Sequence, residues 1–475
     1  MSDRSDLTDL TDLTDLRISP QTTGQFVPGG GGERPCYGTT LYTMSNASSP
    51  SAAPDPAARH LRWNYTIHVV EGSLFIGGLS FVNASTMLPG MLQDLGAPSW
   101  VIAFIPCLML AGLMLPPFFT AHWVDRLERF KPLNVATGFF QRLPYLLAAL
   151  VLLFCDPGAR FWPVLALAGA PFLSGLACGI SMTAWQQLVG KTVPARRRAS
   201  LMALRLLFGS LLGVAAGVTA KALLERVPGV HGYGLLCLCT FGLMMLSYAF
   251  FTCLREDRAK PAMTGAGDME ESLRGAWALL AGHAEMRRYL GILLAAGTIG
   301  IITPFLAIHA RGVLHKPEGY YGDLLVVQMA GALLGNLAAG WAGDRHGPRR
   351  VMMVSQVLFL AVAGLAAFGS TDFAFRLLFG VFGFAISANQ VAQMTLTLEV
   401  CPAHRRSVSL ALVGLTQLTA GMTASFIGFL TWGGPGKIGL AAGIATIGSA
   451  LAFLGLLRLR ETRHPHPQPE LPAAS

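Results

Sequence analysis

The sequence predicts an all-α membrane protein in which twelve transmembrane helices form two pseudo-symmetric six-helix halves. Three observations predict this fold class. Of the 475 residues, 52% are hydrophobic and only 13% are charged, whereas a soluble domain carries roughly 25% charged residues. The apolar residues gather in segments of about 20 or more, the length at which an α-helix crosses a bilayer. Two short sequence motifs each occur once in each half, at corresponding places.

Twelve apolar segments follow one another, six on each side of a polar stretch that begins at Arg255. Several contain proline, among them Pro106, Pro171 and Pro304. Bundled membrane helices tolerate proline because neighbouring groups satisfy the carbonyls that it frees. We expect the helices, in order, at residues 67–90, 99–121, 133–154, 161–189, 200–223, 232–254, 287–310, 321–343, 351–369, 372–398, 407–431 and 437–457.

The positive charges predict the orientation of these helices. The chain has 35 Lys and Arg against 26 Asp and Glu, a net charge of +9. Most of the Lys and Arg lie in the loops after every second helix and in the C-terminal tail. This asymmetry follows the positive-inside rule and places both termini of a plasma-membrane protein in the cytoplasm. Topology therefore explains the basic excess, and we expect no nucleic-acid partner.

Residue patterns that would support an enzyme or a bound cofactor are missing from the sequence. The eight cysteines are scattered, mostly within or beside apolar segments, and none has the spacing of metal ligands. No glycine-rich phosphate loop is present. We therefore expect no catalytic residues, no metal and no cofactor.

The polar segments set the expected domain boundaries. Residues 1–64 predict a disordered cytoplasmic region, and Met44 is an alternative start that leaves open whether residues 1–43 belong to the native protein. Residues 268–290 predict an amphipathic helix, either along the membrane surface or in a solvated linker. The further divisions are an N-terminal half at 65–254, a cytoplasmic linker at 255–286, a C-terminal half at 287–457 and a cytoplasmic tail at 458–475.

Two motifs recur in both halves. GDRHGPRR at residues 343–350 has a more divergent counterpart, VDRLERFK, at residues 124–131. TVPARRR at residues 192–198 matches VCPAHRR at residues 400–406. Many transporters are built from paired halves of this kind, with the substrate site near the bilayer midplane where the halves meet.

With an Asp-Arg loop between the second and third helices of each half, the chain resembles the major facilitator superfamily of secondary transporters from about residue 65 to residue 458. The resemblance implies a cytoplasmic gate in which an aspartate at a helix N-terminus is stabilised by the helix dipole. The first loop lacks the glycines of the second, which leaves its turn geometry open. The excess of Arg over Lys indicates a bacterial source. The implied gating residues are Asp125, Arg126, Asp344, Arg345, Arg349 and Arg350.

Polar side chains inside the apolar segments are the candidates for cargo binding, because such side chains are costly in lipid. Asn389, Gln393 and Thr397 share one face of the tenth helix at i, i+4 spacing, and the resemblance implies that this helix lines the cavity. Hydrogen bonding between helices is the alternative role. The candidate cargo contacts are Asn389, Gln390, Gln393, Trp185, Ser181, Asn336, Gln328, Gln417 and Asn83.

Three charged residues fall inside apolar segments: Glu71, Arg142 and Arg205. The predicted helix bounds place them near the cytoplasmic interface, so the two arginines are expected to extend towards the headgroups. Glu71 is the one carboxylate placed to carry a proton. The lack of deeper charge favours a neutral or amphipathic solute.

Small residues repeat every four positions in the fifth and eighth helices, which the resemblance implies face each other across the halves. Such spacing lets helix backbones approach closely, and it predicts either a sliding seam or static packing. The two stripes are Gly209, Gly213 and Gly217, and Gly331, Gly335, Ala339 and Gly343.

The resulting prediction is a monomeric secondary active transporter that moves a small organic solute by alternating access, driven by a gradient of the solute or of an ion, with protons as a candidate coupling ion. A lipid or lysolipid translocator, or a membrane sensor that does not transport, are the alternatives on the same scaffold. Nothing in the sequence singles out the cargo, the direction of transport, or symport over antiport or uniport.

Overall fold

The structure is all-helical, as the sequence predicts. This computed structural model describes residues 60–459 except 125, 157, 159, 258–281 and 402–405, and this part of the chain contains no strand. Most of the expected N-terminal disordered region, most of the C-terminal tail, Asp125 and most of the expected amphipathic linker helix lie outside the described residues. Residues 61–64, predicted to be disordered, instead begin the first helix, whose polar first turn hydropathy does not detect.

Six crossing segments form the first half of the molecule. A turn divides the first segment into α2 and α3, and Leu115 separates α4 from α5 in the second. The bounds are α2 Leu61–Ser80, α3 Met87–Asp94, α4 Ser99–Met114, α5 Pro116–Val124, α6 Lys131–Phe154, α7 Phe161–Thr192, α8 Ala195–Arg226 and α9 Val230–Thr252.

The second half repeats this plan, and its first segment is again interrupted. Two 3-10 turns, one of which contains Pro304, separate α11 from α12. The bounds are α11 Ala284–Ala296, η1 Gly297–Ile301, η2 Thr303–Phe305, α12 Leu306–Leu314, α13 Tyr320–His346, α14 Pro348–Phe368, α15 Asp372–Val400, α16 Arg406–Thr431 and α17 Gly439–Arg458.

Ten of the described helical segments are long and apolar enough to cross a membrane. The other two crossing segments are α2, which is 20 residues long, and α4, a shorter apolar helix of 16 residues that α5 extends. Over the described residues these make twelve crossing segments, which confirms the predicted fold class.

Two helices that carry charges begin earlier than hydropathy predicts. Helix α2 begins at Leu61 instead of residue 67, and α8 begins at Ala195 instead of residue 200. Their first turns contain polar residues, which an apolar window leaves out. Glu71 and Arg205 therefore lie about ten residues from the start of their helices, a distance of roughly 15 Å along the helix axis at 1.5 Å per residue.

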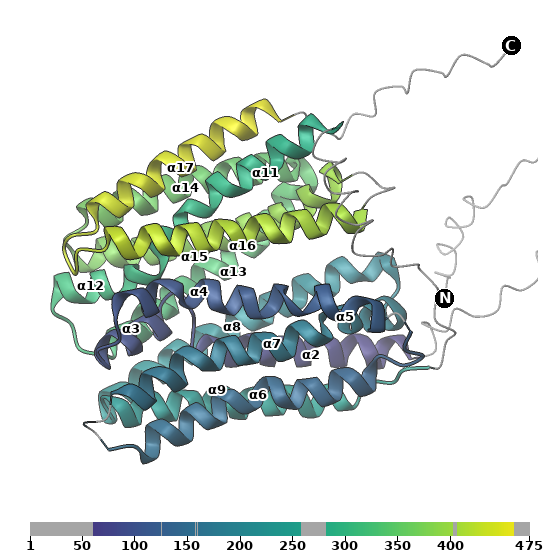
Figure 1. The fold of residues 1–475 in the computed structure, drawn as a ribbon, viewed down its shortest axis with the longest axis horizontal. Helices are drawn as coiled ribbons and strands as arrows, with labels where there is room; N and C mark the ends of the chain where they lie inside the picture. The colour runs from purple at the N-terminus through teal and green to yellow at the C-terminus, as the bar shows by residue number, and fades with distance from the viewer. Residues whose placement is uncertain are drawn as a thin grey trace, which may run out of the picture. The chain divides into compact units, whose positions relative to one another are not determined.

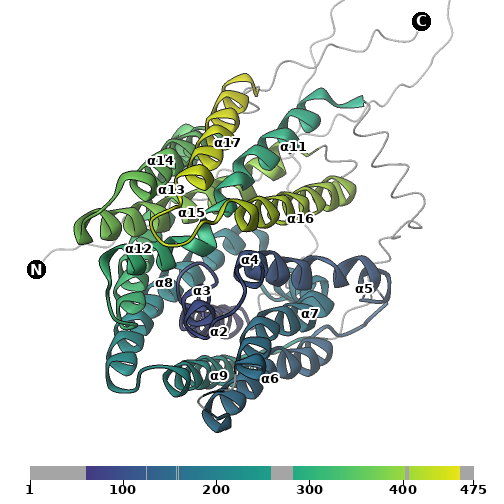
Figure 2. The same ribbon diagram turned by 60° about the vertical axis from the view of Figure 1, so that its left-hand side comes forward.

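The same helix pairings occur in both halves. In the first half, α2 packs on α8 and α9, α7 packs on α4 and α6, and α6 packs on α9. In the second half, α11 packs on α16 and α17, α15 packs on α13 and α14, and α14 packs on α17. Contacts between the halves run mainly from α8 to α13 and from α4 to α16. Figures 1 and 2 show α2–α9 on one side of these contacts and α11–α17 on the other.

The helix bundle has two ends, the Leu61 end and the Asp94 end. At the Leu61 end, on the right of Figure 1, the start of α2 meets the end of α9: Asn64 Nδ2 donates to the carbonyl of Arg255 at 3.0 Å. At the Asp94 end, on the left of Figure 1, lie α3 and α12. The helices are antiparallel neighbours, so the described ends of the chain, Leu61 and Arg458, fall on the same side.

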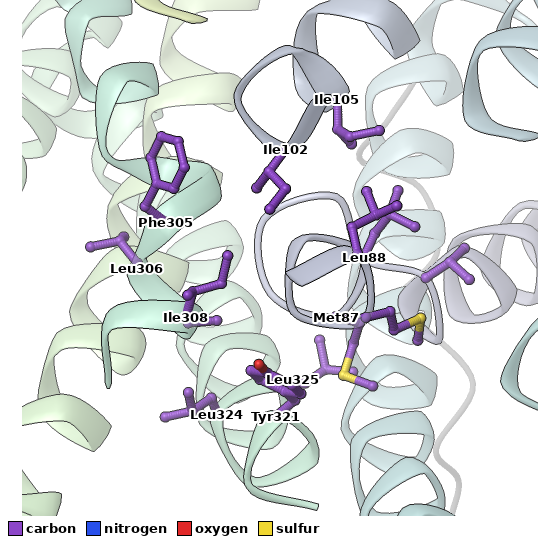
Figure 3. Packing of buried hydrophobic residues seen from close by; sticks show 14 of the residues in the cluster. Met87, Leu88, Ile102, Ile105, Phe305, Leu306, Ile308, Tyr321, Leu324 and Leu325 are labelled. Atoms are coloured by element: carbon purple, nitrogen blue, oxygen red, sulfur yellow. The ribbon is translucent and has the colours of Figure 1, made fainter. Parts of the chain in front are cut away.

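An apolar cluster joins the two halves at the Asp94 end. Figure 3 shows residues of α3 and α4, among them Leu88 and Ile102, lying beside residues of η2, α12 and α13 such as Phe305 and Leu325. These side chains are at most 1% exposed. A Cβ on Gly90 would come within 2.5 Å of the Tyr321 ring, so glycine is needed for this approach. The interrupted first segments of both halves therefore meet and fill the space between the halves here.

The predicted seam between the fifth and eighth helices exists, but only one of the two stripes forms it. Gly213 and Gly217 of α8 lie against α13, where added Cβ atoms would come within 2.8 Å of Met329 and Val326 respectively. On α13, Gly331 and Gly335 instead face α15, where added Cβ atoms would come within 2.1 and 2.4 Å of backbone oxygens in the same half. The prediction that this second stripe faces α8 is wrong.

Candidate functional site

A buried ion pair lies inside the first half, between α2 and α8. Nη1 of Arg205 donates to Oε2 of Glu71 at 2.9 Å and to the backbone carbonyl of His68 at 3.1 Å. The Arg205 guanidinium also lies 5.1 Å from the Trp185 ring centroid, in a cation–π contact. Glu71 and Arg205 are 5% and 8% exposed.

Arg142 of α6 is the third member of this charge cluster, which we define as Glu71, Arg142 and Arg205. Its Nε donates to the carbonyl of Met244 and its Nη1 to that of Gly138, each at 2.6 Å. Its Nη2 lies 3.4 Å from the hydroxyl of Ser247, which is 3.5 Å from Glu71 Oε1. Neutral acceptors therefore hold Arg142, while Glu71 pairs with Arg205.

The expectation that the two arginines extend to the headgroups is wrong. Both are buried and bonded to neighbouring helices, and Glu71 lies nearly three turns inside α2. The polar first turns of α2 and α8 lie outside the predicted apolar segments. The helices therefore carry buried charge, which removes the reason given for a neutral solute.

The polar face of α15 is engaged within its own half. Oδ1 of Asn389 accepts from Nε2 of Gln356, a fully buried residue of α14, at 3.1 Å. Thr397 lies 2.6 Å from the Tyr289 hydroxyl of α11, and the same hydroxyl is 3.3 Å from the carbonyl of Gln393. In this conformation Asn389 therefore makes a hydrogen bond to a neighbouring helix, which is the alternative role that the sequence left open for it.

Gln328 joins the two halves. Its Nε2 donates to the Ser85 hydroxyl at 2.9 Å, and its Oε1 accepts from Thr86. Asn83 stabilises the same turn between α2 and α3, because its Oδ1 accepts from the amide and the hydroxyl of Ser85 at 3.0 and 2.7 Å. These two candidate cargo contacts therefore lie together, beside the closure at the Asp94 end.

The remaining cargo candidates are spread over both halves. Ser181 is buried and bonds back to the Ala177 carbonyl at 3.4 Å. Gln390 is exposed on α15, and Asn336 of α13 and Gln417 of α16 are half-buried. Trp185 is the one that touches the charge cluster.

Ion pairs cross between the halves at the Asp94 end. Asp94 of α3 pairs with Arg311 of α12, and Asp94 also accepts from the Tyr233 hydroxyl at 2.7 Å. Lys221 of α8 bonds both carboxylate oxygens of Asp323 of α13, at 3.0 and 3.1 Å. The amide of Gly229 donates to Glu318 at 2.7 Å. We call these contacts, together with the apolar cluster of Figure 3, the Asp94-end closure.

The loop between α13 and α14 is built on a glycine. Gly347 has φ +91°, a conformation that L side chains rarely adopt. Asp344, Arg345 and Arg350 are exposed on either side of it. In the first copy, Glu128 occupies the corresponding position, and His315 is the one non-glycine residue with positive φ among those described. The first loop therefore makes a different turn.

Basic residues of both loops bind the end of the last helix in their half. Nε and Nη2 of Arg349 donate to the carbonyls of Leu456 and Leu457 at 2.7 and 2.9 Å. Nζ of Lys131 donates to the carbonyl of Leu254, after α9, at 2.7 Å. A cation at a helix C-terminus satisfies free carbonyls and complements the helix dipole. Arg126 is exposed, and Asp125 is outside the described residues.

Several residues of these sites were not singled out from the sequence. His68 is fully buried and bonds Thr192 at 3.0 Å, and Arg311 lies just beyond the helix predicted at residues 287–310. Lys221 and Asp323 flank Gly217 and Gly322, which make the closest approach of α8 to α13. In the sequence, the available signal for the Lys221–Asp323 ion pair was a charged residue close to a glycine in each of the two helices.

Comparison with known proteins supports a transporter fold. Residues 288–474 match the family model described as Major Facilitator Superfamily. The chain is 31% identical over 178 residues to a D-xylose transporter of Levilactobacillus brevis, and 30% identical over 132 residues to solute carrier family 2, facilitated glucose transporter member 10, of Danio rerio. These matches cover 36% and 27% of this chain but only 38% and 25% of the relatives. Multidrug resistance protein MdtL of Escherichia fergusonii is 23% identical over 76% of this chain and 78% of its own.

Solved transporter structures share the arrangement of helices. A D-xylose-proton symporter superposes with a TM-score of 0.67 at 13% identity, over 85% of this chain and 98% of its own. The nucleoside transporter NupG gives a TM-score of 0.61 at 16% identity, over 84% and 100%. The second half of the chain therefore matches the Major Facilitator Superfamily by sequence, and the chain shares its fold with these solved transporters.

Proposed function

We propose that this protein is a secondary active transporter that moves a small organic solute across the cytoplasmic membrane by alternating access. The observation that carries the proposal is the position of the contacts between the halves. Every cross-half ion pair and side-chain hydrogen bond named above lies at or near the Asp94 end. At the other end of α13, added Cβ atoms on Gly340 and Gly343 would meet nothing within 4 Å.

This asymmetry fits one state of an alternating-access cycle. With the Asp94 end closed and the Leu61 end less tightly joined, the conformation corresponds to access from the Leu61 side. The positive-inside distribution of charge supports assigning the Leu61 side to the cytoplasm. The α2–α9 and α11–α17 halves would then rock against each other along the α8–α13 and α4–α16 contacts, as a monomer.

The proposed roles of the residues follow from their positions in the helices and loops. Glu71 is the proposed proton carrier, because it is a buried carboxylate among membrane-spanning helices with polar partners on two of them, α8 and α9. Trp185, Ser181, Asn336, Asn389, Gln390, Gln393 and Gln417 are the proposed cargo contacts, and Gln328 and Asn83 would reach cargo when the closure opens. Asp125, Arg126, Asp344, Arg345, Arg349 and Arg350 are the proposed gate on the cytoplasmic side.

Access to the seam tests the mechanism without knowledge of the cargo. Ser80, the last residue of α2, is buried against Met329 of α13, beneath the closure. A Ser80→Cys variant in proteoliposomes should react with an impermeant thiol reagent added on the Asp94 side, at a slow rate that reports opening. The parent protein, which keeps its native cysteines, gives the background. Reaction from the Leu61 side alone, under every gradient applied, would contradict alternating access.

Orientation is tested by a second pair of cysteines. Arg350 lies at the Leu61 end and Lys437 at the Asp94 end, and both are exposed. In intact cells, an impermeant reagent should label Lys437→Cys, and should label Arg350→Cys only after the membrane is opened. The reverse pattern would invert the proposed topology.

A further inference from the structure

The charge cluster is not electrically balanced. It holds two guanidinium groups and one carboxylate, and Glu71 is the only carboxylate that the described residues bring to it. Arg142 is satisfied by carbonyl oxygens, which neutralise none of its charge. A charge buried among membrane-spanning helices without a counter-ion is costly. The cluster therefore carries one uncompensated positive charge inside the first half.

Arg205 is the member placed to bind an added anion. Its two bonds within the described residues both leave from Nη1, although a guanidinium has five donors. The group lies directly over Gly72, where a Cβ would come within 2.0 Å of Nε. Trp185, a proposed cargo contact, stacks over it. The sequence thus provides space on α2 for a guanidinium and an aromatic surface beside it.

We propose that Arg205 binds a carboxylate group of the cargo when Glu71 takes up a proton. The inference rests on the proposed transport function and adds a substrate class to it. Protonation turns the Glu71 carboxylate into a neutral acid and frees Arg205, and a cargo carboxylate then replaces the lost negative charge. The cluster has the same net charge before and after, so proton and monocarboxylate enter together without adding buried charge.

The groups around Glu71 come from every helix packed against it. Arg205 faces it from α8, Arg142 from α6, Ser247 from α9 and Cys178 from α7. His68 lies on the same helix, one turn away. The Thr192 hydroxyl donates to the Leu188 carbonyl at 2.7 Å, so the hydroxyl oxygen accepts a hydrogen bond from Nε2 of His68. The other ring nitrogen, Nδ1, is buried and unbonded within the described residues, as in a neutral ring. His68 is thus the second group that could hold the proton.

Matched pairs of small solutes test this assignment. The probes are monocarboxylates (acetate, benzoate, gluconate) and their uncharged amides. Binding of each probe is measured by the rise in melting temperature of the purified full-length protein. Transport is measured by uptake into proteoliposomes with an inward proton gradient. Carboxylates should stabilise wild type, and should stabilise Glu71→Gln, which imitates the protonated acid, at lower concentration. Arg205→Gln should raise the concentration needed by roughly 10- to 100-fold, the range for a charged hydrogen bond.

Controls separate binding from folding and from transport. The double variant Glu71→Gln/Arg205→Gln removes both charges of the pair and should fold but still not respond to carboxylates. Arg288→Gln removes an exposed positive charge at the Leu61 end and should respond as wild type. His68→Gln should keep the carboxylate response if Glu71 is the proton carrier.

Each outcome decides between the proposals. Stabilisation by the amides, an equal carboxylate response in Arg205→Gln, or no response of any protein to any carboxylate overturns the anion site. Transport of an uncharged solute with Arg205 replaced overturns it while leaving the transport function in place. Carboxylate binding without uptake leaves the site in place and overturns the transport function.

Discussion

At the scale of single residues, the glycine beside Glu71 decides whether the charge cluster can exist. The Arg205 guanidinium occupies the space that a side chain on Gly72 would fill. The sequence identified Glu71 and Arg205 as charges inside apolar segments. It did not reveal that they pair, because pairing depends on the depth of both helices and on a close approach that only a glycine allows.

Gly72→Ala should therefore disrupt the ion pair. The added Cβ would lie 2.0 Å from Arg205 Nε, so the guanidinium must move away from α2 and from Glu71. We expect the free energy of unfolding to fall by roughly 1–3 kcal/mol, the usual cost of overpacking, read as a lower melting temperature in detergent. Gly242→Ala in α9 is the matched control, because its Cβ would meet nothing within 4 Å. Equal melting temperatures would show that Arg205 is not held against α2.

The pair of Asn389 and Gln356 allows the two roles of Asn389 to be separated. Replacing either residue with leucine removes the same interhelical hydrogen bond, which typically contributes only about 0.6 kcal/mol in membrane proteins. If Asn389 also binds cargo, Asn389→Leu alone should raise the half-saturation concentration of transport, by an amount equivalent to about 1–3 kcal/mol. Indistinguishable kinetics in the two variants would make Asn389 a packing residue.

At the scale of helices, the existence of every predicted membrane-spanning segment is confirmed, while ends and neighbours were harder to derive. Hydropathy located the apolar middle of α2 and α8 and missed their polar first turns. The stripe of small residues on α13 was read correctly as a close-packing face and assigned to the wrong helix. Periodicity shows which face of a helix is small, but the neighbour on that face is set by tertiary packing.

The seam between α8 and α13 should tolerate a larger residue only where the halves are apart. Gly217→Leu would place its Cβ 2.8 Å from Val326 and force the halves apart at the Asp94 end. We expect a lower melting temperature and faster thiol labelling of Ser80→Cys from that side. Gly340→Leu on α13 has open space at its Cβ and should leave both measurements near their wild-type values. Similar effects of the two substitutions would argue against a seam that is closed at one end.

At the scale of the whole molecule, the internal repeat in the sequence is matched by a repeat in packing. Arg349 and Lys131, near corresponding positions of the two loops, bind the last helix of their respective halves, although the loops differ in turn geometry. Most of this fold could be predicted, because membrane spans and duplicated motifs are local features of the sequence. The candidate site could be predicted only residue by residue, because its ion pairs join helices that are far apart in the chain.

The ion pairs of the Asp94-end closure should set how often that end opens. Lys221–Asp323 and Arg311–Asp94 each join one half to the other, and their side chains are 18–40% exposed. Partly exposed pairs contribute up to about 1 kcal/mol each, so the double variant Lys221→Gln/Arg311→Gln should favour the open state roughly three- to thirtyfold. The measurement is the rate at which Ser80→Cys reacts with an impermeant reagent from the Asp94 side. Arg288→Gln, which breaks an exposed pair within one helix at the Leu61 end, should leave that rate unchanged. If the double variant also reacts at the unchanged rate, the apolar cluster of α3, α12 and α13 alone holds the closure.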